Sequence, residues 1–152
     1  MINKSQKGMT IFEMFVTLAI ISVVITMGMP GFNSFVKRME VRNTLRTITG
    51  VLNTARFKAI MLNKRVKFCI EDKNEEDTVI RLKEKREGDS KWKEFMEFNL
   101  EKKVSVTINS SPIFFPNGNI APLCSILVEN EVSHYKITIS IAGRIKITEM
   151  IS

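Results

Sequence analysis

The chain has 152 residues, of which 44% are hydrophobic and 26% are charged, and its formal net charge is +7. This composition is globular rather than disordered, and the length suits one domain of ordinary size. The basic excess is compatible with an acidic partner or a polyanion, although modest basicity also serves simply to keep a domain soluble. Apolar residues concentrate near the N-terminus, so the hydropathy of the whole chain averages over two different environments.

The N-terminal segment predicts a membrane-spanning helix. It begins with the short basic stretch MINKSQKG, and the apolar run at 9–29 contains a single charged side chain, that of Glu13. A helix of this length reaches about 30 Å, the thickness of the hydrocarbon core of a bilayer. The basic residues hold the first end in the cytoplasm by the positive-inside rule, so the chain after Pro30 is expected outside the cytoplasm. The run is too long for the core of a cleaved signal peptide and ends without a small-x-small site.

Glu13 is the exception within this run. A carboxylate inside an apolar helix is costly, and in a membrane it indicates a functional role that needs a partner. The alternative is a side chain that reaches back to the nearby interface.

The helical pattern continues to about residue 63. Apolar residues recur at steps of three and four and define one face, with basic residues at other positions. We expect Gly28 and Pro30 to kink the helix or melt it locally, because proline removes a backbone donor and clashes one turn back. The apolar positions are Phe32, Phe35, Val36, Met39, Leu45, Ile48, Val51, Leu52, Ala55, Ala59 and Ile60.

Beyond residue 63 the pattern changes to that of short strands, many of which alternate apolar and polar residues. Turn-forming residues separate several of them at 72–74, 88–90, 116–119 and 142–143, with the best hairpin signals at Asn117-Gly118 and Gly143. We therefore expect an α+β fold in which the amphipathic half of the helix covers an antiparallel sheet. The predicted strands are 66–71, 78–84, 92–98, 104–108, 113–115, 124–129, 135–141 and 144–150.

The segment KGMTIFEMFVTLAII resembles the class III leader and mature start of type IV pilins and type II secretion pseudopilins. Gly8 matches the glycine after which a prepilin peptidase cleaves, and Met9 matches the residue that becomes N-methylated, although phenylalanine is commoner there. Glu13 matches the glutamate of the mature chain, and Pro30 matches the usual helix-breaking proline. The resemblance implies that Glu13 neutralises the terminal cation of a neighbouring subunit and so sets the register between subunits, each charge lessening the desolvation cost of the other.

Three later segments are similar to the GspH/FimT branch of this family. They are the helix end and strand entry at 52–69, with Ala55-Arg56, Ala59-Ile60 and Val66, the turn IFFPNGNI at 113–120, and the strand IAGRIKI at 141–147. The resemblance implies the pilin-like fold, with a leader at 1–8, a transmembrane or filament-core helix at 9–30, an amphipathic helix at 31–63 and a β-rich periplasmic region at 64–152.

The implied role is that of a minor pilin or pseudopilin, anchored by a single pass in the inner membrane with a cytoplasmic N-terminus. Its implied partners are other pilins, met through the N-terminal helix, and the prepilin peptidase. The filament is that of a type II secretion system for protein secretion or of a type IV pilus, because both share this N-terminus. The alternative is a competence minor pilin that binds DNA.

No pattern for catalysis or cofactor binding is found. The chain has no HExxH, GxSxG, GxGxxG or P-loop sequence. His134 stands before a predicted strand without a spaced nucleophile, which favours a surface or strand-edge residue. The acidic residues at 71–77 surround a predicted turn and fit no calcium loop, which favours a solvated hairpin tip. We therefore expect no enzyme, no metal and no cofactor.

Two cysteines, Cys69 and Cys124, lie far apart in the sequence. Outside the cytoplasm they can form a disulfide between two strands. The alternative is two small buried side chains.

The stretch Gly143-Arg144-Ile145-Lys146 resembles the Gly-Arg-x-Arg stretch through which some FimT-type minor pilins bind DNA. Alternation along the predicted strand places Arg144 and Lys146 on one face, where both can contact phosphates, although lysine lacks the planar fork of arginine. The alternative is an edge strand whose outward cations oppose aggregation.

Overall fold

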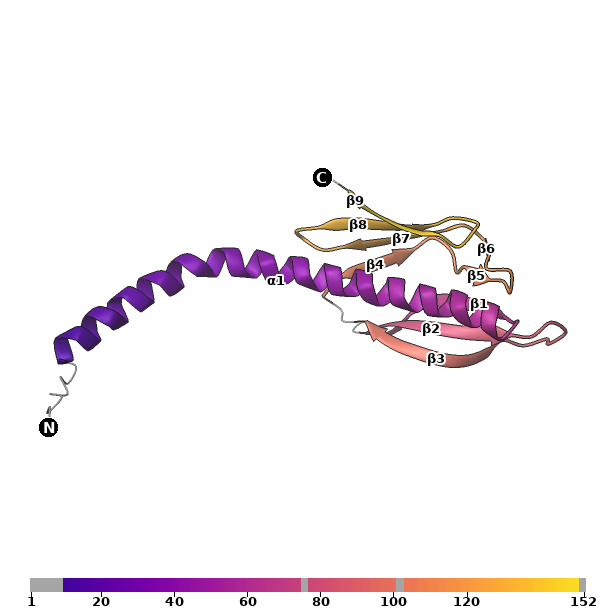
Figure 1. Cartoon of the computed structure of the whole chain (residues 1–152), viewed down its shortest axis with the longest axis horizontal. Coiled ribbons are helices and arrows are strands. Elements are labelled where there is room, and N and C mark those ends of the chain that lie inside the picture. Colours follow the sequence, from indigo (N-terminus) through magenta and orange to yellow (C-terminus); the bar gives the residue numbers. More distant parts are fainter. Residues whose placement is uncertain (1–9, 75–76, 101–102, 151–152) are drawn as a thin grey trace, which may run out of the picture. The chain divides into compact units, whose positions relative to one another are not determined.

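The structure, a computed structural model, describes residues 10–74, 77–100 and 103–150 (Figure 1). It has two units, Met1–Val36, here called the first unit, and Lys37–Ser152, here called the head unit. The helix α1 (Ile11–Met61) contributes to both. The head unit contains the strands β1 (Arg65–Asn74), β2 (Asp77–Lys85), β3 (Lys93–Leu100), β4 (Ser105–Ile108), β5 (Ile113–Phe114), β6 (Ile120–Ala121), β7 (Cys124–Glu129), β8 (His134–Ile139) and β9 (Ile145–Met150).

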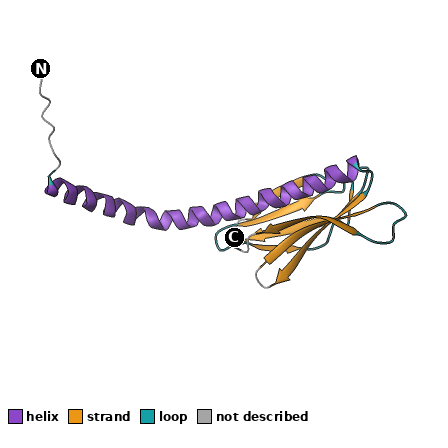
Figure 2. Ribbon diagram, turned by 90° about the horizontal axis from the view of Figure 1, so that it is seen from below, coloured by secondary structure: helices purple, strands orange, loops and turns teal. Residues whose placement is uncertain are grey.

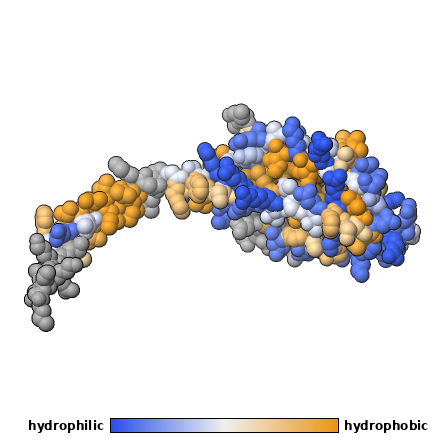
Figure 3. Space-filling model, viewed as in Figure 1, coloured by the Kyte–Doolittle hydropathy of each residue, from blue (hydrophilic) through white to orange (hydrophobic). Residues whose placement is uncertain are grey.

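In the first unit α1 presents apolar side chains that nothing in the described chain covers (Figure 3). Ile11 and Phe12 are each 77% exposed, and Val24 is 64% exposed. The backbone is helical through Gly28 and Pro30, so the local melting expected there does not occur. Among the described residues no single helix is long and apolar enough to span a membrane. Ile11–Thr26 and Gly31–Met61 reach that length and composition only together, as a bent pair.

In the head unit one face of α1 is buried, and the prediction of that face is partly correct. Leu45, Ile48 and Leu52 are buried as expected, whereas Met39 and Ile60 are exposed. Since each residue turns the helix by about 100°, Met39 lies roughly 200° from the position two residues later, Val41, which is buried instead. The full buried set on the helix is Val41, Thr44, Leu45, Ile48, Val51, Leu52, Ala55 and Ala59.

The strands form two antiparallel sheets where the sequence predicted one. The first has the order β3-β2-β1-β5-β6 and the second has the order β4-β7-β8-β9. The prediction matches β7 at both ends but missed the two-residue strand β6. It also placed a turn where β1 still pairs with β2, through Asp72↔Thr78 and Asn74↔Asp77.

One hydrophobic core joins α1 to both sheets, and Figure 2 shows the helix lying along the strands. The expectation that the helix covers the apolar face of the β-rich region is therefore confirmed. On β7, alternate residues face this core, which gives Cys124, Ile126 and Val128 inward positions. Burying a large apolar side chain contributes about 1.5–3 kcal/mol, so the residues shared by helix and sheets hold the head unit together. The largest fully buried members include Phe68, Phe114, Ile48, Leu52, Ile80, Leu82, Ile126 and Ile137.

Candidate functional site

Glu13 makes a reciprocal cap at the start of α1. The backbone N–H of Thr10 donates to Glu13 Oε2 at 2.9 Å, and the Thr10 hydroxyl donates to the same oxygen at 3.1 Å. The backbone N–H of Glu13 in turn donates to Thr10 Oγ1 at 3.2 Å. This is the capping box, in which a threonine and a glutamate three residues later satisfy backbone donors that a helix start leaves free. The sequence analysis missed it, although Thr-x-x-Glu is its signature.

The capping box uses only one of the two carboxylate oxygens of Glu13, Oε2. Within the described residues Oε1 of Glu13 makes no hydrogen bond, because both contacts from Thr10 go to Oε2. Gly8 and Met9, the residues at which processing is predicted, lie outside the described residues, and Pro30 is described only by its helical backbone.

The three segments that carry the GspH/FimT resemblance meet around Arg56. The Arg56 guanidinium donates from Nη2 to the carbonyl oxygen of Ala142 at 2.9 Å and from Nη1 to that of Gly143 at 3.2 Å. Gly118 lies against the same side chain, and a Cβ built on it would be 3.5 Å from Arg56 Nη2. Gly118 and Gly143 have φ angles of 79° and 70°, a region that favours glycine.

At Gly143 the space is also closed. A Cβ there would lie 2.6 Å from the carbonyl oxygen of Gly118 and 2.9 Å from Arg56 Nε. The arginine thus joins the end of the helix to the β5–β6 and β8–β9 turns. The predicted turns at Gly118 and Gly143 are both present, and the contact between them through Arg56 is a structural relationship that sequence reasoning missed.

Arg144 and Lys146 occupy different local structures. Arg144 lies in the turn before β9, where its backbone N–H donates to Ser140 Oγ at 3.2 Å and its carbonyl accepts from the N–H of Ser140 at 3.0 Å. Lys146 lies within β9 and pairs with Thr138 of β8. Both residues are exposed, and neither side chain forms an ion pair within the described chain.

Two cations of the first sheet, Arg81 and Lys83, are by contrast neutralised by carboxylates. Arg81 Nη1 lies 2.7 Å from Glu71 Oε2, and Lys83 Nζ lies 2.7 Å from Glu71 Oε1. Glu94 and Glu97 approach the other side of the Arg81 guanidinium at 3.6 and 3.3 Å. The hydrogen bond from Lys83 is the main cause that lowers the pKa of Glu71, with the charge of Arg81 adding to it. This network explains Glu71, which the sequence analysis grouped with the acidic turn, as a structural carboxylate.

The rest of the acidic turn is described only in part. Glu75 and Glu76 lie outside the described residues, and the described part of the chain holds no group of three acidic, histidine or cysteine side chains arranged for a metal ion.

Cys69 and Cys124 are both buried and are free thiols in this structure, which is the second of the two states that the sequence allows. Cys69 lies on β1 of the first sheet and Cys124 on β7 of the second. Burial raises the pKa of the Cys124 thiol to about 11, although the thiol donates to the carbonyl of Ser110 at 3.3 Å. A thiol that stays protonated is a poor nucleophile and a poor metal ligand.

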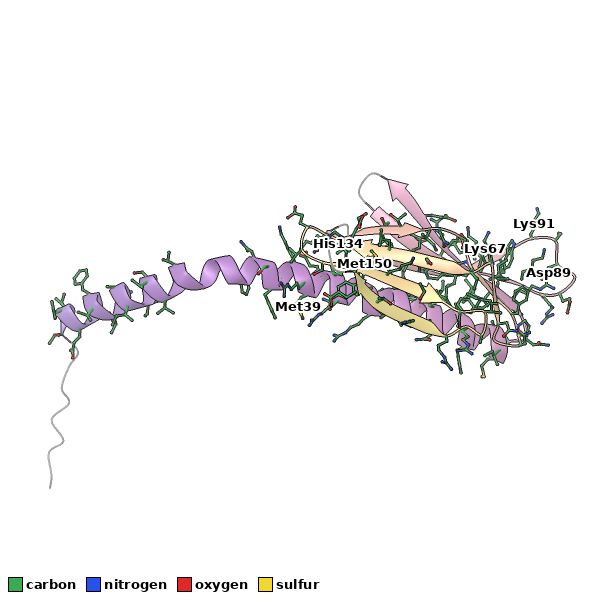
Figure 4. The ribbon with its side chains drawn as sticks, turned by 90° about the horizontal axis from the view of Figure 1, so that it is seen from above. Met39, Lys67, Asp89, Lys91, His134 and Met150 are labelled. Carbon is green, nitrogen blue, oxygen red and sulfur yellow. The ribbon has the colours of Figure 1, made fainter. Side chains whose placement is uncertain are left out.

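His134 is the first residue of β8, opposite Met150 of β9 (Figure 4). Its Nδ1 lies 3.4 Å from Glu129 Oε2, across the β7–β8 pair. This half-buried strand-end position agrees with the structural role expected for it. No described nucleophile is hydrogen-bonded to the ring.

Comparison with solved structures identifies the fold. The type IV minor pilin FimU of Pseudomonas aeruginosa superposes with a TM-score of 0.57 at 15% identity, covering 75% of this chain and 92% of that chain. The minor pseudopilin EpsH of the Vibrio cholerae type II secretion system superposes with a TM-score of 0.58 at 9% identity, covering 74% and 96%. No protein-family model and no curated protein sequence matches the chain. The chain therefore has the fold of minor pilins and pseudopilins, as the N-terminal resemblance implied.

Proposed function

We propose that the chain is a minor subunit of a pilus-like filament, of the GspH/FimT kind, with a structural rather than a catalytic role. The observation that carries this proposal is the combination of a pilin-like fold with a first unit whose described apolar side chains have no cover among the described residues. An exposed apolar surface of this extent requires lipid or other apolar helices around it. An inner membrane before assembly and a bundle of like helices after assembly meet that requirement in turn.

In this proposal a prepilin peptidase removes residues 1–8 and Met9 is N-methylated. The new terminal amine is a cation in an apolar bundle, and Oε1 of Glu13, which makes no hydrogen bond among the described residues, can accept from the amine of a neighbouring subunit. The pairing reduces the cost of burying both charges and fixes the axial register.

The experiment that tests processing is the intact mass of the chain extracted from membranes. The proposal predicts loss of the first eight residues and gain of one methyl group. A mature chain that still begins at Met1, or that begins after the apolar run, refutes it. Whether the filament belongs to a secretion system or a type IV pilus is decided by the neighbouring genes, since secretion genes and twitching genes mark the two cases.

A second candidate function is DNA capture through Arg144 and Lys146. It is favoured by the exposure of both side chains and by their lack of ion pairs in the described chain, whereas Arg81 and Lys83 of the first sheet are neutralised by carboxylates. Two unpaired cations two residues apart in the chain can bind the phosphates of DNA, and such binding weakens as salt is added. The test is titration of the full chain in detergent with a DNA duplex at rising salt. Binding that survives Arg144→Gln with Lys146→Gln excludes these residues as the site.

A further inference from the structure

A groove of about 450 Å³ runs between α1 and β9 in the head unit. Its walls come from the solvent side of the helix and from the last strand of the second sheet. The residues that line it are Arg42, Leu45, Arg46, Thr49, Gly50 and Ile147.

The strand wall of the groove is an open sheet edge. β9 is the terminal strand in the order β4-β7-β8-β9, and among the described strands it pairs with β8 alone. An edge strand presents alternate backbone N–H and C=O groups that an added strand can satisfy. No strand of the described chain occupies this position.

The floor of the groove is apolar and has room. Ile147 of β9 is 46% exposed although it lies on the same strand face as Ile145, which packs against the core, and Leu45 belongs to that core. A Cβ built on Gly50 would meet no atom within 4 Å, so the helix leaves space there. Thr49 Oγ1, which also lines the groove, is buried without a hydrogen-bond partner among the described atoms.

The helix wall is basic. Arg42 and Arg46 are one turn apart on α1, are both exposed, and form no ion pair in the described chain. The acidic residue nearest in sequence to Ile147, Glu149, accepts a hydrogen bond from the Tyr135 hydroxyl at 3.1 Å. Two unpaired guanidinium groups beside an apolar floor favour a ligand that carries carboxylates next to apolar side chains.

We propose that this groove binds an extended acidic segment of a partner protein, which adds to β9 as a further strand. Its backbone pairs with the free edge of β9, its apolar side chains cover Ile147, and its carboxylates meet Arg42 and Arg46. The site lies in the head unit, so it goes beyond the proposed filament contact of the first unit and survives or fails separately from it.

The probe is a synthetic peptide of about eight alternating valine and glutamate residues, a length typical of one strand. It is titrated against the full chain in detergent micelles while backbone amide signals are followed by NMR. We expect shifts confined to β9 and the 42–50 stretch of α1, with slower hydrogen exchange in β9. A peptide with lysine in place of glutamate should bind at least about tenfold more weakly.

Two variants test the basic helix wall and the space above the apolar floor, while the amide signals of β9 test the strand wall. Arg42→Glu with Arg46→Glu should reverse the preference in favour of the lysine peptide, whereas Lys91→Glu with Lys136→Glu, an equal charge change at exposed lysines outside the groove, should leave it unchanged. Gly50→Leu should fill the groove and weaken binding of the glutamate peptide at least about tenfold, while the melting temperature stays the same or rises because leucine favours a helix.

Other outcomes overturn the proposal. Binding of the glutamate peptide that is indifferent to Gly50→Leu, or shifts that bypass β9, would exclude strand addition. Concentration-dependent shifts of the same residues without peptide would assign the groove to a second copy of the chain. Shifts produced by a DNA duplex and not by the peptide would assign it to a polyanion.

Discussion

Arg56 and Gly143 stand 87 residues apart in sequence, yet Arg56 Nη1 donates to the carbonyl oxygen of Gly143 at 3.2 Å. The contact needs glycine, because a side chain there would displace the guanidinium that makes it. It fixes the turn that leads into β9, and with it the placement of the strand that carries Lys146 and walls the groove.

Replacing Gly143 by alanine should destabilise the head unit by about 3 kcal/mol. The positive φ of 70° contributes part of the loss, and the approach of the new Cβ to the Gly118 carbonyl and to Arg56 contributes the rest. Gly88→Ala is the matched control, since Gly88 also has a positive φ, 96°, but open space around it. Gly88→Ala should cost about 1 kcal/mol when the free energies of unfolding of both variants are measured by urea denaturation. Equal losses for the two variants would mean that the close contact at Gly143 has no energetic weight.

Arg56→Met should lower the free energy of unfolding by about 1–3 kcal/mol, because two backbone carbonyls lose a charged donor. Arg56→Lys should recover little, since one ammonium group cannot reproduce the fork that spans the carbonyls of Ala142 and Gly143. Arg46→Met, which removes an exposed arginine without such bonds, should change stability by less than about 0.5 kcal/mol. A loss for Arg56→Met as small as that for Arg46→Met would contradict the role given to Arg56.

The ion network around Glu71 predicts a pH dependence of stability. The folded-state pKa of Glu71 lies below its ordinary value of 4.5, chiefly through the Lys83 hydrogen bond. Its contribution is therefore complete above the unfolded pKa and is lost as the pH falls through the folded pKa. Glu71→Gln should lower the melting temperature at pH 7 and flatten its decline in acid. The pKa of Glu131 is also lowered, by Lys37, but this pair is solvent-exposed, so Glu131→Gln should have the smaller effect. A melting temperature that Glu71→Gln leaves unchanged both at pH 7 and in acid would show that the network does not stabilise the fold.

The raised pKa of Cys124, about 11, predicts a thiol that resists alkylation in the folded chain. At pH 8 almost none of it is thiolate, and burial blocks access as well. Mass spectrometry after brief iodoacetamide treatment should find Cys124 unmodified in native protein and modified in urea. Rapid labelling of the native protein would show that this part of β7 opens, and a mass difference on reduction would show that the chain carries a disulfide after all.

The alternation of side chains predicted most strands, because the two sheets each bury one face. In β7 Cys124, Ile126 and Val128 are buried and the residues between them are partly exposed, which is the pattern that sequence reasoning detects. β6 has two residues, too few to show any period, and owes its place to pairing with β5. A local pattern also cannot distinguish one sheet from two, since that division depends on which strands pair across long distances.

The candidate site was predictable where a local motif carries it. The Thr10–Glu13 cap is a local signature, and the turns at Gly118 and Gly143 follow from local residue preference. The Arg56 contacts and the groove between α1 and β9 join segments far apart in the chain, so no local pattern encodes them. The helix face was misjudged before Val41 because apolar spacing continues into the first unit, whose described apolar residues have no cover in the part of the chain that the structure describes.

The charge of Glu13 is the centre of the account, and the cap it forms with Thr10 allows the two roles to be separated. Glutamine in place of Glu13 can keep the cap, since a capping box accepts either residue, but it cannot neutralise a terminal amine. Thr10→Ala removes the cap and keeps the charge. The direct measurement is the fraction of each variant recovered in sheared filaments relative to the membrane. We predict that Glu13→Gln and Glu13→Ala enter the membrane but not the filament, while Thr10→Ala enters both. Filaments that contain the two Glu13 variants at the level of the unaltered chain would contradict the account.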